Sequence, residues 1–470
     1  MRAARARIVA RRSFHWRSLT PPPWLVVALL VFAACLFGIL TRPFGLLATF
    51  WPANAIMLGY MLRHPDAARP FGWIASAGAF MAADLLTGSS LQVAALLNCG
   101  NMVSIGIAYL VLRRLPQDVI RLRQPMSVPW LFAGCAAGGA VAGLVGMAAN
   151  PILFGGGMWR GWQFWFTTEL VNYVTVLPMV LAFPSRPRPP VRKPAMSLRQ
   201  LAPLIALIYS CLAAKLVGGP GAIAFPVPAL LWCGLSYPVF RTCILTAFCG
   251  YWAMETLANQ YILPAEQTSD AFNLVSFRLG LSMLFIAPIM LTSITANRNA
   301  AYDMLMHAAN HDGLTGIANR NAFMHSAQTI CRSGDPAGAL LMLDLDFFKS
   351  INDRYGHAGG DAVLIGFAQR VRECLRGCDL FGRVGGEEFA VLIPNCSRPG
   401  AILVAERIRQ ALNDHPIILS DSRKIHITAS IGVAMAEADM SADIGQLMAQ
   451  ADDALYRAKS AGRNRIEMAD

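Results

Sequence analysis

Two glutamates near the C-terminal end of the chain stand where they could bind a divalent cation beside a phosphate. Glu387 and Glu388 directly follow the pair Gly385–Gly386, and an apolar run flanks this segment on each side. A Gly-Gly pair tolerates the positive φ angles of a two-residue primed turn, so the segment predicts a β-hairpin with the glycines at its tip. Glycine also lets a phosphate or metal ion approach the backbone closely, and hard cations prefer carboxylate oxygens. The tip is therefore a candidate metal and phosphate site.

A second acidic pair follows a predicted buried strand. Residues 339–345 are a nearly continuous apolar run, and Asp344 and Asp346 stand at its end. Such a run is typical of a strand that is buried on both faces. In an open α/β sheet, ligands bind beyond the carboxyl ends of the strands. We therefore expect acids of this strand and of the hairpin to converge on one site.

The elements around these acids alternate between strands and helices. Apolar residues recur at helical spacing in residues 360–376, 402–412 and 444–458, and residues 425–434 predict a further strand. This alternation predicts an α/β domain over residues 311–470.

Four motifs of this domain occur in the order and at the spacing of the GGDEF family, and the domain resembles the diguanylate cyclases of that family. They are the opening motif at 311–320, the acidic strand, the signature from Gly385 to Phe389, and the closing segment at 454–465. The resemblance implies a nucleotidyl-cyclase-like fold with a central, mainly antiparallel sheet. It also implies that the domain condenses two GTP molecules to cyclic di-GMP and two pyrophosphates.

The resemblance further implies that Mg²⁺ ions, or Mn²⁺ ions, assist this condensation. The implied ligands are Asp344, the backbone carbonyl of Leu345, and either Glu387 or Glu388. One of the two glutamates would also help to deprotonate the attacking 3′-hydroxyl, and the sequence does not divide these roles. Attack of a hydroxyl on an α-phosphate depends mainly on positioning and on neutralising phosphate charge, which carboxylate-bound metal ions achieve.

Other positions match the nucleotide-binding residues of the family. Asn352 and Asp361 match its guanine-binding positions, and these acceptors suit the N–H donors on the Watson–Crick edge of guanine. An aspartate at 361 favours GTP, because adenine would turn an acceptor toward the carboxylate. His357 aligns with the site and fits a turn residue equally well. The implied phosphate contacts are the turn residues Phe347, Phe348 and Lys349 and the cations Lys459 and Arg463.

An arginine and an aspartate upstream of the hairpin match a product-binding motif. Arg376 and Asp379 have the RxxD pattern of the family's inhibitory site, with five residues between the motif and Gly385. A guanidinium can bind a phosphate through two parallel hydrogen bonds or stack on guanine, and Arg407 is a candidate second arginine. The resemblance thus implies inhibition by cyclic di-GMP. Because each domain holds one GTP, it also implies a homodimer.

The rest of the chain has the composition of a membrane protein. Hydrophobic residues make up 55% of the chain and charged residues only 14%, which excludes an ordinary soluble enzyme. The net charge of +12 comes largely from arginines between apolar runs, so it indicates the positive-inside pattern and not nucleic-acid binding. The 11 cysteines contain no CxxC pair, which argues against a zinc site or a disulfide framework.

We expect about ten spans of the lipid bilayer between a basic cytoplasmic N-terminus, residues 1–23, and a short helical stalk, residues 296–310. An even number places the arginine-rich loops and the cyclase domain on the cytoplasmic side of a bacterial inner membrane. The stalk prediction rests on the lack of a helix breaker and on apolar residues at intervals of about 3.5 positions. The expected spans within the sensor region 24–295 lie near residues 24–41, 46–62, 70–87, 91–112, 128–148, 163–183, 201–218, 222–237, 242–258 and 273–295.

Short motifs in this membrane region resemble the first class of bacterial membrane-associated sensor domains. They are residues 50–55, a segment that ends at Asp84, and residues 172–178. The stimulus cannot be read from these motifs. The chain as a whole therefore resembles a cyclase that is controlled by a membrane sensor.

Several polar residues fall within the expected spans, where ionisable groups are costly unless they are paired or wetted. Our hypothesis is that Glu169, Lys215 and Glu255 line a stimulus pocket. The other residues of this kind are Asn54, Asp84, Asn98, Asn101, Asn172 and Arg278. The asparagines fit interhelical hydrogen bonds.

Two other functions remain compatible with the sequence. A non-catalytic receptor could bind cyclic di-GMP through Arg376 and Asp379. The intact signature at 385–389 favours an enzyme, because degenerate relatives generally lose its acids or glycines. Alternatively, the membrane region could be a transporter on which the cyclase reports, and an uptake assay discriminates this case.

Overall fold

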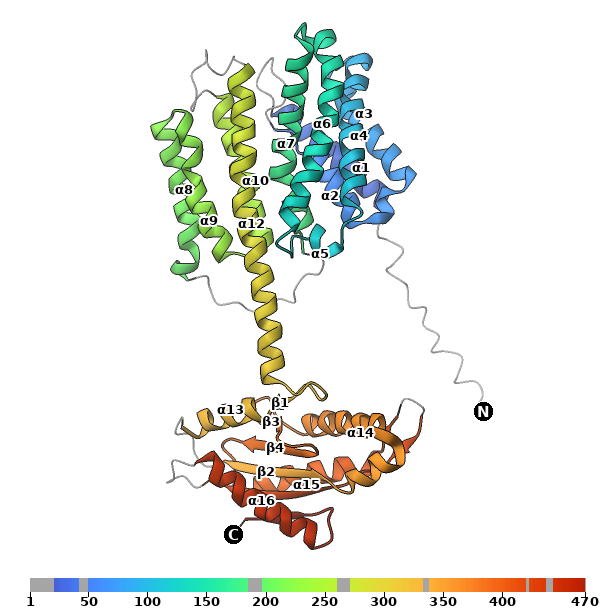
Figure 1. Ribbon diagram of the computed structural model, residues 1–470, viewed down its shortest axis with the longest axis vertical. Helices are drawn as coiled ribbons and strands as arrows, with labels where there is room; N and C mark the ends of the chain where they lie inside the picture. Colours follow the sequence, from blue (N-terminus) through green and yellow to red (C-terminus); the bar gives the residue numbers. More distant parts are fainter. Residues whose placement is uncertain are drawn as a thin grey trace, which may run out of the picture. The chain divides into compact units, whose positions relative to one another are not determined.

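The computed structural model describes residues 21–41, 50–184, 197–259, 271–332, 338–419, 422–436 and 443–469. The chain divides into two compact units, residues 1–300 and 301–470, which are drawn in Figure 1. Three segments named by the sequence predictions lie outside the described residues: the basic N-terminus up to residue 20, the arginine-rich loop at 186–193, and the acidic loop at 265–270.

The described part of the N-terminal unit is helical. Its helices are α1 (Pro23–Leu40), α2 (Ala53–Arg63), α3 (Pro70–Leu86), α4 (Leu91–Leu112), α5 (Gln117–Ile120), α6 (Ser127–Phe154), α7 (Met158–Leu181), α8 (Leu198–Val217), α9 (Pro226–Ser236), α10 (Val239–Ala258) and α12 (Ala271–Asn310), with the 3-10 helices η2 (Pro65–Ala68) and η3 (Pro220–Ala224). Each of the ten expected spans overlaps one of these helices. Among the described residues, six helices are long and apolar enough to cross a membrane: α1, α4, α6, α7, α8 and α12.

The second expected span, residues 46–62, differs from the prediction. The helix α2 begins only at Ala53, directly after Pro52, and has 11 residues. The backbone N–H of Trp51 instead donates to the side-chain oxygen of Asn172 in α7 at 2.9 Å. Proline fits the start of a helix because it has no N–H to donate to a preceding turn. This hydrogen bond joins two of the motifs that the sequence analysis singled out.

Close packing of α6 against its neighbours depends on glycine. A Cβ on Gly146 would lie 2.5 Å from a ring carbon of Trp165, and one on Gly138 would lie 2.8 Å from the carbonyl oxygen of Ser104. Helices in lipid associate largely through van der Waals packing, so small residues allow their backbones to approach. Substitution of either glycine is therefore expected to separate α6 from α7 or α4.

The helix α12 runs without a break from the last expected span through the stalk segment 296–310. It contains 40 residues, with Pro288 inside it, and is therefore about 60 Å long. Leu281 and Ile289 in its first half are buried, whereas Tyr302 and Leu305 in its second half are 57% and 69% exposed. The stalk is thus the continuation of the last helix of the membrane unit.

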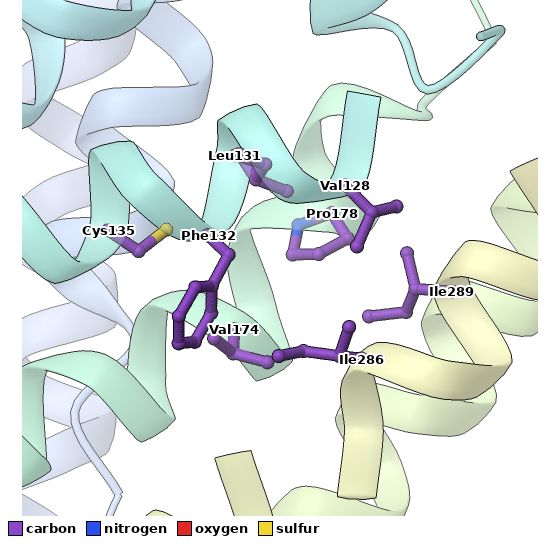
Figure 2. Close-up of a pocket in the computed structure, with 8 residues that line it drawn as sticks. All are labelled: Val128, Leu131, Phe132, Cys135, Val174, Pro178, Ile286 and Ile289. Atoms are coloured by element: carbon purple, nitrogen blue, oxygen red, sulfur yellow. The ribbon is translucent and has the colours of Figure 1, made fainter. Parts of the chain in front are cut away.

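A small pocket lies between α6, α7 and α12 (Figure 2). Phe132 of α6, Val174 and Pro178 of α7, and Ile286 and Ile289 of α12 contribute to its apolar walls. Because no charged side chain lines it, it does not fit a polar ligand. It marks an apolar contact between α12 and the helices α6 and α7.

The C-terminal unit is an α/β domain with a six-stranded sheet in the order β1-β3-β4-β2-β7-β8. The elements are β1 (Ala318–Asn319), α13 (Arg320–Arg332), β2 (Ala339–Leu345), α14 (Phe348–Glu373), β3 (Leu380–Arg383), β4 (Glu388–Ile393), α15 (Arg398–Asp414), β5 (Ile417–Ile418), β6 (Lys424–Ile425), β7 (Ala429–Met435), α16 (Ile444–Ser460) and β8 (Ile466–Met468). The three central pairings are antiparallel, and β1 and β8 pair in parallel at the two edges. This confirms the predicted α/β class with a mainly antiparallel sheet.

The central strand β2 is buried on both faces, as its apolar run predicts. Leu341 and Leu343 belong to the same core cluster as Phe367 of α14. Leu340, on the opposite face, shares a second cluster with Phe323 of α13. Helices on both faces therefore fix β2 and with it the acids at its end.

Candidate active site

The acids of the strand and of the hairpin converge, as predicted. The register of β2 and β4 places Asp344 directly opposite Glu388, so their side chains lie on the same face of the sheet. The backbone N–H of Leu345 donates to the carbonyl of Glu387 at 3.4 Å. Asp344 is only 4% exposed, and the Nζ of Lys459 lies 2.7 Å from its Oδ2.

Burial raises the pKa of Asp344 to about 6, although the hydrogen bond and the charge of Lys459 lower it. The negative charges of Glu387 and Glu388 raise this pKa further. A carboxylate with an elevated pKa beside two others marks a place with excess negative charge. Cations are therefore favoured there.

The donor set fits a divalent cation. Within the described part of the chain, no group of three or more His, Cys, Asp or Glu side chains is already arranged to hold a metal ion. Mg²⁺ commonly takes only one or two carboxylates from the protein and completes its shell with substrate phosphates and water. The ammonium group of Lys459 occupies a cation position beside Asp344. The strand register brings two of the predicted ligands, Asp344 and Glu388, to the same face of the sheet, and their carboxylates are of the type that such an ion prefers.

Asp344→Asn is expected to stabilise the metal-free protein at pH 7.5 by about 1 kcal/mol, after allowance for solvent screening. The carboxyl ionises near pH 4 when unfolded and near pH 6 when folded. Ionisation of Asp344 therefore does not lower the free energy of unfolding below pH 4 and lowers it fully above pH 6. Thermal unfolding of the full chain in EDTA measures this effect. A difference between variant and wild type that is equal at pH 4.5 and pH 7.5 contradicts the assignment.

The hairpin turn differs from the predicted two-residue primed turn. Neither Gly385 nor Gly386 has a positive φ, and the N–H groups of Val384 and Gly385 both donate to the carbonyl of Glu388, at 2.9 and 3.2 Å. Gly385 leaves space for the Glu388 carboxylate, because a Cβ there would overlap it and move it from this position. A Cβ on Gly386 would meet nothing within 4 Å. The backbone at Gly386 is therefore open to an approaching ligand.

An ion pair that the sequence analysis did not foresee holds this turn. The Nη1 of Arg383 lies 3.0 Å from Asp312 Oδ1, and its Nε donates to the carbonyl of Gly386 at 3.0 Å. Asp312 also accepts hydrogen bonds from the N–H and the hydroxyl of Thr315, at 2.8 and 2.6 Å. Burial raises the pKa of Asp312, but these bonds from Thr315 and Arg383 outweigh it and lower the pKa overall. The segment that follows α12 is thus connected to the signature turn.

Arg383→Met is expected to lower kcat about tenfold with little change in the KM for GTP. The substitution keeps an unbranched apolar stem and removes both the pair with Asp312 and the bond to the Gly386 carbonyl, so Glu387 and Glu388 lose their fixed positions. Steady-state kinetics of the full chain measure the two constants. Arg372→Met, an exposed arginine at the end of α14, is the control, and an equal loss in both variants contradicts the positioning role.

Asp346, the second acid of the strand, has a structural role. It is 4% exposed, and its two carboxylate oxygens accept from Thr428 Oγ1 and Ser430 Oγ at 2.7 Å each and from the N–H of Asn464 at 3.0 Å. These bonds tie the end of β2 to β7 and to the closing segment. Both of its oxygens are therefore engaged by hydrogen bonds within the domain.

The predicted phosphate-binding turn leads directly into a helix. Phe347 has a positive φ of 57° and precedes the first turn of α14, which contains Phe348 and Lys349. The N-terminus of a helix presents backbone N–H groups and favours anions. Arg463 lies with its guanidinium 4.7 Å from the centre of the Phe347 ring, so this predicted cation is beside the same turn. The other predicted cation, Lys459, pairs with Asp344 in this structure.

The two predicted guanine-binding residues lie on either side of a break in α14. Gly356 has a φ of 73° and a non-helical backbone, which separates Asn352 from the rest of the helix. A Cβ on Gly360 would overlap the side-chain oxygen of Asn352, so the Asn352 amide lies against the residue next to Asp361. Asn352 is half-buried, and His357 and Asp361 are exposed.

The three residues of the predicted inhibitory site also cluster. The backbone N–H of Arg376 donates to Asp379 Oδ2 at 2.7 Å, which fixes the RxxD turn. The guanidinium of Arg407 in α15 donates to the carbonyl of Cys374, two residues before Arg376. The Arg376 side chain is exposed and that of Asp379 is half-buried, so the guanidinium is accessible beside the start of β3.

In the membrane unit, the predicted interhelical asparagines form one hydrogen-bonded chain. Asn54 Nδ2 donates to Glu169 Oε1 and to Asn101 Oδ1, both at 2.9 Å. Asn101 Nδ2 donates to Asn98 Oδ1 at 3.0 Å, and Asn98 Nδ2 donates to Asp84 Oδ2 at 2.8 Å. This chain connects α2, α3, α4 and α7, which agrees with the interhelical interpretation.

The structure corrects the hypothesis that Glu169, Lys215 and Glu255 line one pocket. Glu169 is 8% exposed, whereas Lys215 is exposed in the last turn of α8. Glu255 is half-buried near the end of α10 and accepts from Asn259 at 2.8 Å. A lysine in the last turn of a helix interacts favourably with the helix dipole and extends its charge toward water. Of these three residues, only Glu169 belongs to the buried polar chain.

Known proteins match both units. Residues 309–465 match the family described as diguanylate cyclase, GGDEF domain, and residues 23–300 match the family MASE1. The probable diguanylate cyclase DgcF of Escherichia coli O157:H7 is 32% identical over 426 residues, which cover 89% of this chain and 89% of that protein. Diguanylate cyclase A of Treponema denticola is 44% identical over 147 residues, 31% of this chain and 39% of that protein.

A solved structure is similar to part of the chain. The coiled coil and GGDEF domain of DgcB from Caulobacter crescentus, in complex with c-di-GMP, shares 29% sequence identity. The similarity covers 38% of this chain and 95% of that chain, with a TM-score of 0.36.

Proposed function

Because this chain belongs to the diguanylate cyclases that join a MASE1 membrane domain to a GGDEF domain, we propose that it condenses two GTP molecules to cyclic di-GMP under the control of its membrane unit. The observation that carries the proposal is the pairing of Asp344 with Glu388 across β2 and β4, beside an intact signature. A protein that only binds cyclic di-GMP does not need these acids on one face.

The chemistry is two attacks of a ribose 3′-hydroxyl on the α-phosphorus of the other GTP. In each attack a new O–P bond forms, the bond to pyrophosphate breaks, and the hydroxyl proton passes to a base. A divalent ion, Mg²⁺ in this proposal, supplies charge neutralisation and makes the hydroxyl more acidic. The ion would be held at the end of β2 by Asp344, the Leu345 carbonyl and Glu388. Glu387, beside them, is the proposed proton acceptor.

The remaining residues hold the nucleotide. The first turn of α14 offers backbone N–H groups to the triphosphate, and Lys349 and Arg463 add positive charge beside it. Asn352 and Asp361 accept hydrogen bonds from guanine. Lys459 is expected to move its ammonium group from Asp344 to a phosphate when a metal ion binds.

A homodimer completes the site, because each cyclase domain holds one GTP and the reaction joins two. The stalk part of α12 supports this proposal. Its side chains at Tyr302 and Leu305, which lie one turn apart on the same side of the helix, are 57% and 69% exposed. Such exposed apolar residues on a helix are typical of a face that pairs with a second copy. The membrane unit can then change how the two domains face each other.

The MASE1 domain and the apolar helices make the chain an integral membrane protein. We place it in the bacterial inner membrane with its N-terminus and cyclase domain in the cytoplasm. This orientation follows from the arginine-rich loops and from the location of GTP.

The decisive experiment incubates the purified full chain, in detergent, with GTP and Mg²⁺ and separates the nucleotides by chromatography. Cyclic di-GMP and pyrophosphate are expected in a ratio of one to two, and EDTA is expected to abolish both. The proposed reaction is contradicted if neither product forms in detergent or in lipid nanodiscs.

Arg376→Ala is expected to raise the inhibition constant for cyclic di-GMP at least about tenfold while the initial rate stays within twofold. The substitution removes the accessible guanidinium of the RxxD turn but not the active site. Rates measured with added product give the constant. Arg398→Ala, at the start of α15, is the matched control, and unchanged inhibition of the Arg376 variant contradicts the site.

A further inference from the structure

The most unusual charge of the membrane unit is a buried arginine on α12. Arg278 lies in the second turn of this helix and is 2% exposed. Its Nη1 donates to Thr168 Oγ1 of α7 at 2.6 Å, and its guanidinium lies 4.4 Å from the centre of the Phe164 ring. Its Nε is buried and has no hydrogen-bond partner.

This environment leaves the positive charge uncompensated by the described residues. No described carboxylate forms an ion pair with Arg278. The nearest acid along α7, Glu169, already accepts from Asn54 at 2.9 Å and from Ser104 at 3.4 Å. A buried guanidinium needs both a counter-charge and acceptors for its five N–H groups. The structure supplies one hydroxyl and one aromatic face.

We propose that Arg278 anchors a binding site for an oxyanion, a carboxylate or a phosphate group, within the membrane unit. The Nε and one Nη of an arginine form a planar fork that matches two oxygens of such a group. Thr168 holds the other side of the guanidinium, and the Phe164 ring fixes its plane. Together they leave the fork directed away from Thr168.

The position of Arg278 connects ligand binding to output. Arg278 and the stalk residue Leu305 belong to the same uninterrupted helix. An oxyanion bound to Arg278 changes how α12 packs against α7, because Thr168 and Phe164 are both on α7. Two turns further along α12, Ile286 and Ile289 face α6 and α7 across the small apolar pocket, so this interface is where a change in packing would continue toward the stalk (Figure 2). The signalling part of this inference rests on the proposed cyclase function, whereas the binding part does not.

The test measures binding without using the cyclase. All 10 tryptophans of the chain lie between positions 16 and 252, so tryptophan fluorescence reports unfolding of the membrane unit alone. The full chain in detergent is heated in sodium chloride and, at equal ionic strength, in sodium phosphate, sulfate, acetate or succinate. At least one of these anions is expected to raise the Tm of the wild type by about 3 °C or more.

Arg278→Met is expected to abolish this rise, and Arg160→Met, an exposed arginine on α7, is expected to keep it. Arg278→Lys, which keeps the charge but not the fork, covers the case that the methionine variant does not fold, and is expected to weaken binding at least tenfold. The proposal is overturned if none of the four anions raises the Tm in detergent and phosphatidylglycerol in nanodiscs causes no rise that depends on Arg278. An equal rise in the wild type and in both Arg278 variants also overturns it.

Two further measurements identify the source of the oxyanion and its effect. In nanodiscs, a rise in Tm that depends on Arg278 and on phosphatidylglycerol assigns the site to a lipid headgroup, whereas a rise with free anions in detergent assigns it to a soluble ligand. The effective anion is expected to change the rate of cyclic di-GMP formation at least twofold in the wild type and not in Arg278→Met. An unchanged rate in an active enzyme overturns the signalling role. An inactive enzyme that still shows the Tm rise counts against the proposed function only.

Discussion

Glu388→Gln is expected to lower the rate of cyclic di-GMP formation by at least about 10³-fold while GTP binding falls less than tenfold. Glu388 faces Asp344 across the sheet, so the amide removes one of the two opposed carboxylates at the place where positive charge must be held. The phosphate turn and the guanine contacts lie on α14 and are untouched. The loss should therefore appear in kcat and not in affinity.

The shape of the glutamine is close to that of the glutamate, which separates charge from packing. The Glu388 carboxylate occupies the space that Gly385 leaves open, and a glutamine at 388 fits the same space. Glu373→Gln, at an exposed position at the end of α14, is the control and is expected to have wild-type activity. Single-turnover rates with a fluorescent GTP analogue give chemistry and binding separately. A tenfold or smaller loss in the chemical step would show that Glu388 does not carry the metal charge.

Glu387→Gln, compared in the same assay, divides the two roles that the sequence leaves open. If Glu387 accepts the hydroxyl proton, its variant loses rate more strongly at low pH than at high pH, because hydroxide replaces the base. If it holds the metal instead, added Mn²⁺ is expected to restore part of the rate. The register of the strands favours the first role, since Glu388 is the residue opposite Asp344.

Local patterns were sufficient to predict an α/β domain and the convergence of its acids, whereas the mainly antiparallel sheet was implied by the resemblance to the GGDEF family. The apolar run of β2 has no polar residue before Asp344, which is a strong signal for a strand buried on both faces. The hairpin follows from two apolar runs around a glycine pair. The type of turn could not be read in the same way, because glycine serves either a positive φ or a lack of space. At Gly385 the reason is space, and that depends on where the Glu388 side chain lies.

Long-range pairs were beyond the reach of the sequence. Arg383 and Asp312 are 71 positions apart, and no sequence pattern around either residue indicates the other as its partner. The membrane unit shows the same limit. Its apolar runs predicted the helices, but amide and carboxylate groups at membrane depth can pair in many ways, and only the packing selects Asn54 as the partner of Glu169 and exposes Lys215.

Asn352→Ala is expected to lower kcat/KM for GTP about 10²-fold. The Asn352 amide lies against Gly360, beside Asp361, so the two acceptors approach one base edge together. Removing one leaves a guanine N–H donor without a partner in the closed site. A substrate analogue that lacks this donor should lose less, because it has no donor to satisfy. Kinetics with GTP and ITP, whose base lacks the exocyclic amino group, measure the difference.

Gly360→Ala tests the same geometry without altering an acceptor. Its Cβ would overlap the side-chain oxygen of Asn352, so the amide must turn away and the variant is expected to resemble Asn352→Ala. Asp353→Asn, an exposed neighbour on the same helix, is expected to leave kcat/KM unchanged. If Gly360→Ala retains full activity with GTP while Asn352→Ala does not, the amide is not held against Gly360 when the nucleotide is bound. If both variants lose activity equally with GTP and with ITP, Asn352 acts on the fold of α14 and not on the base.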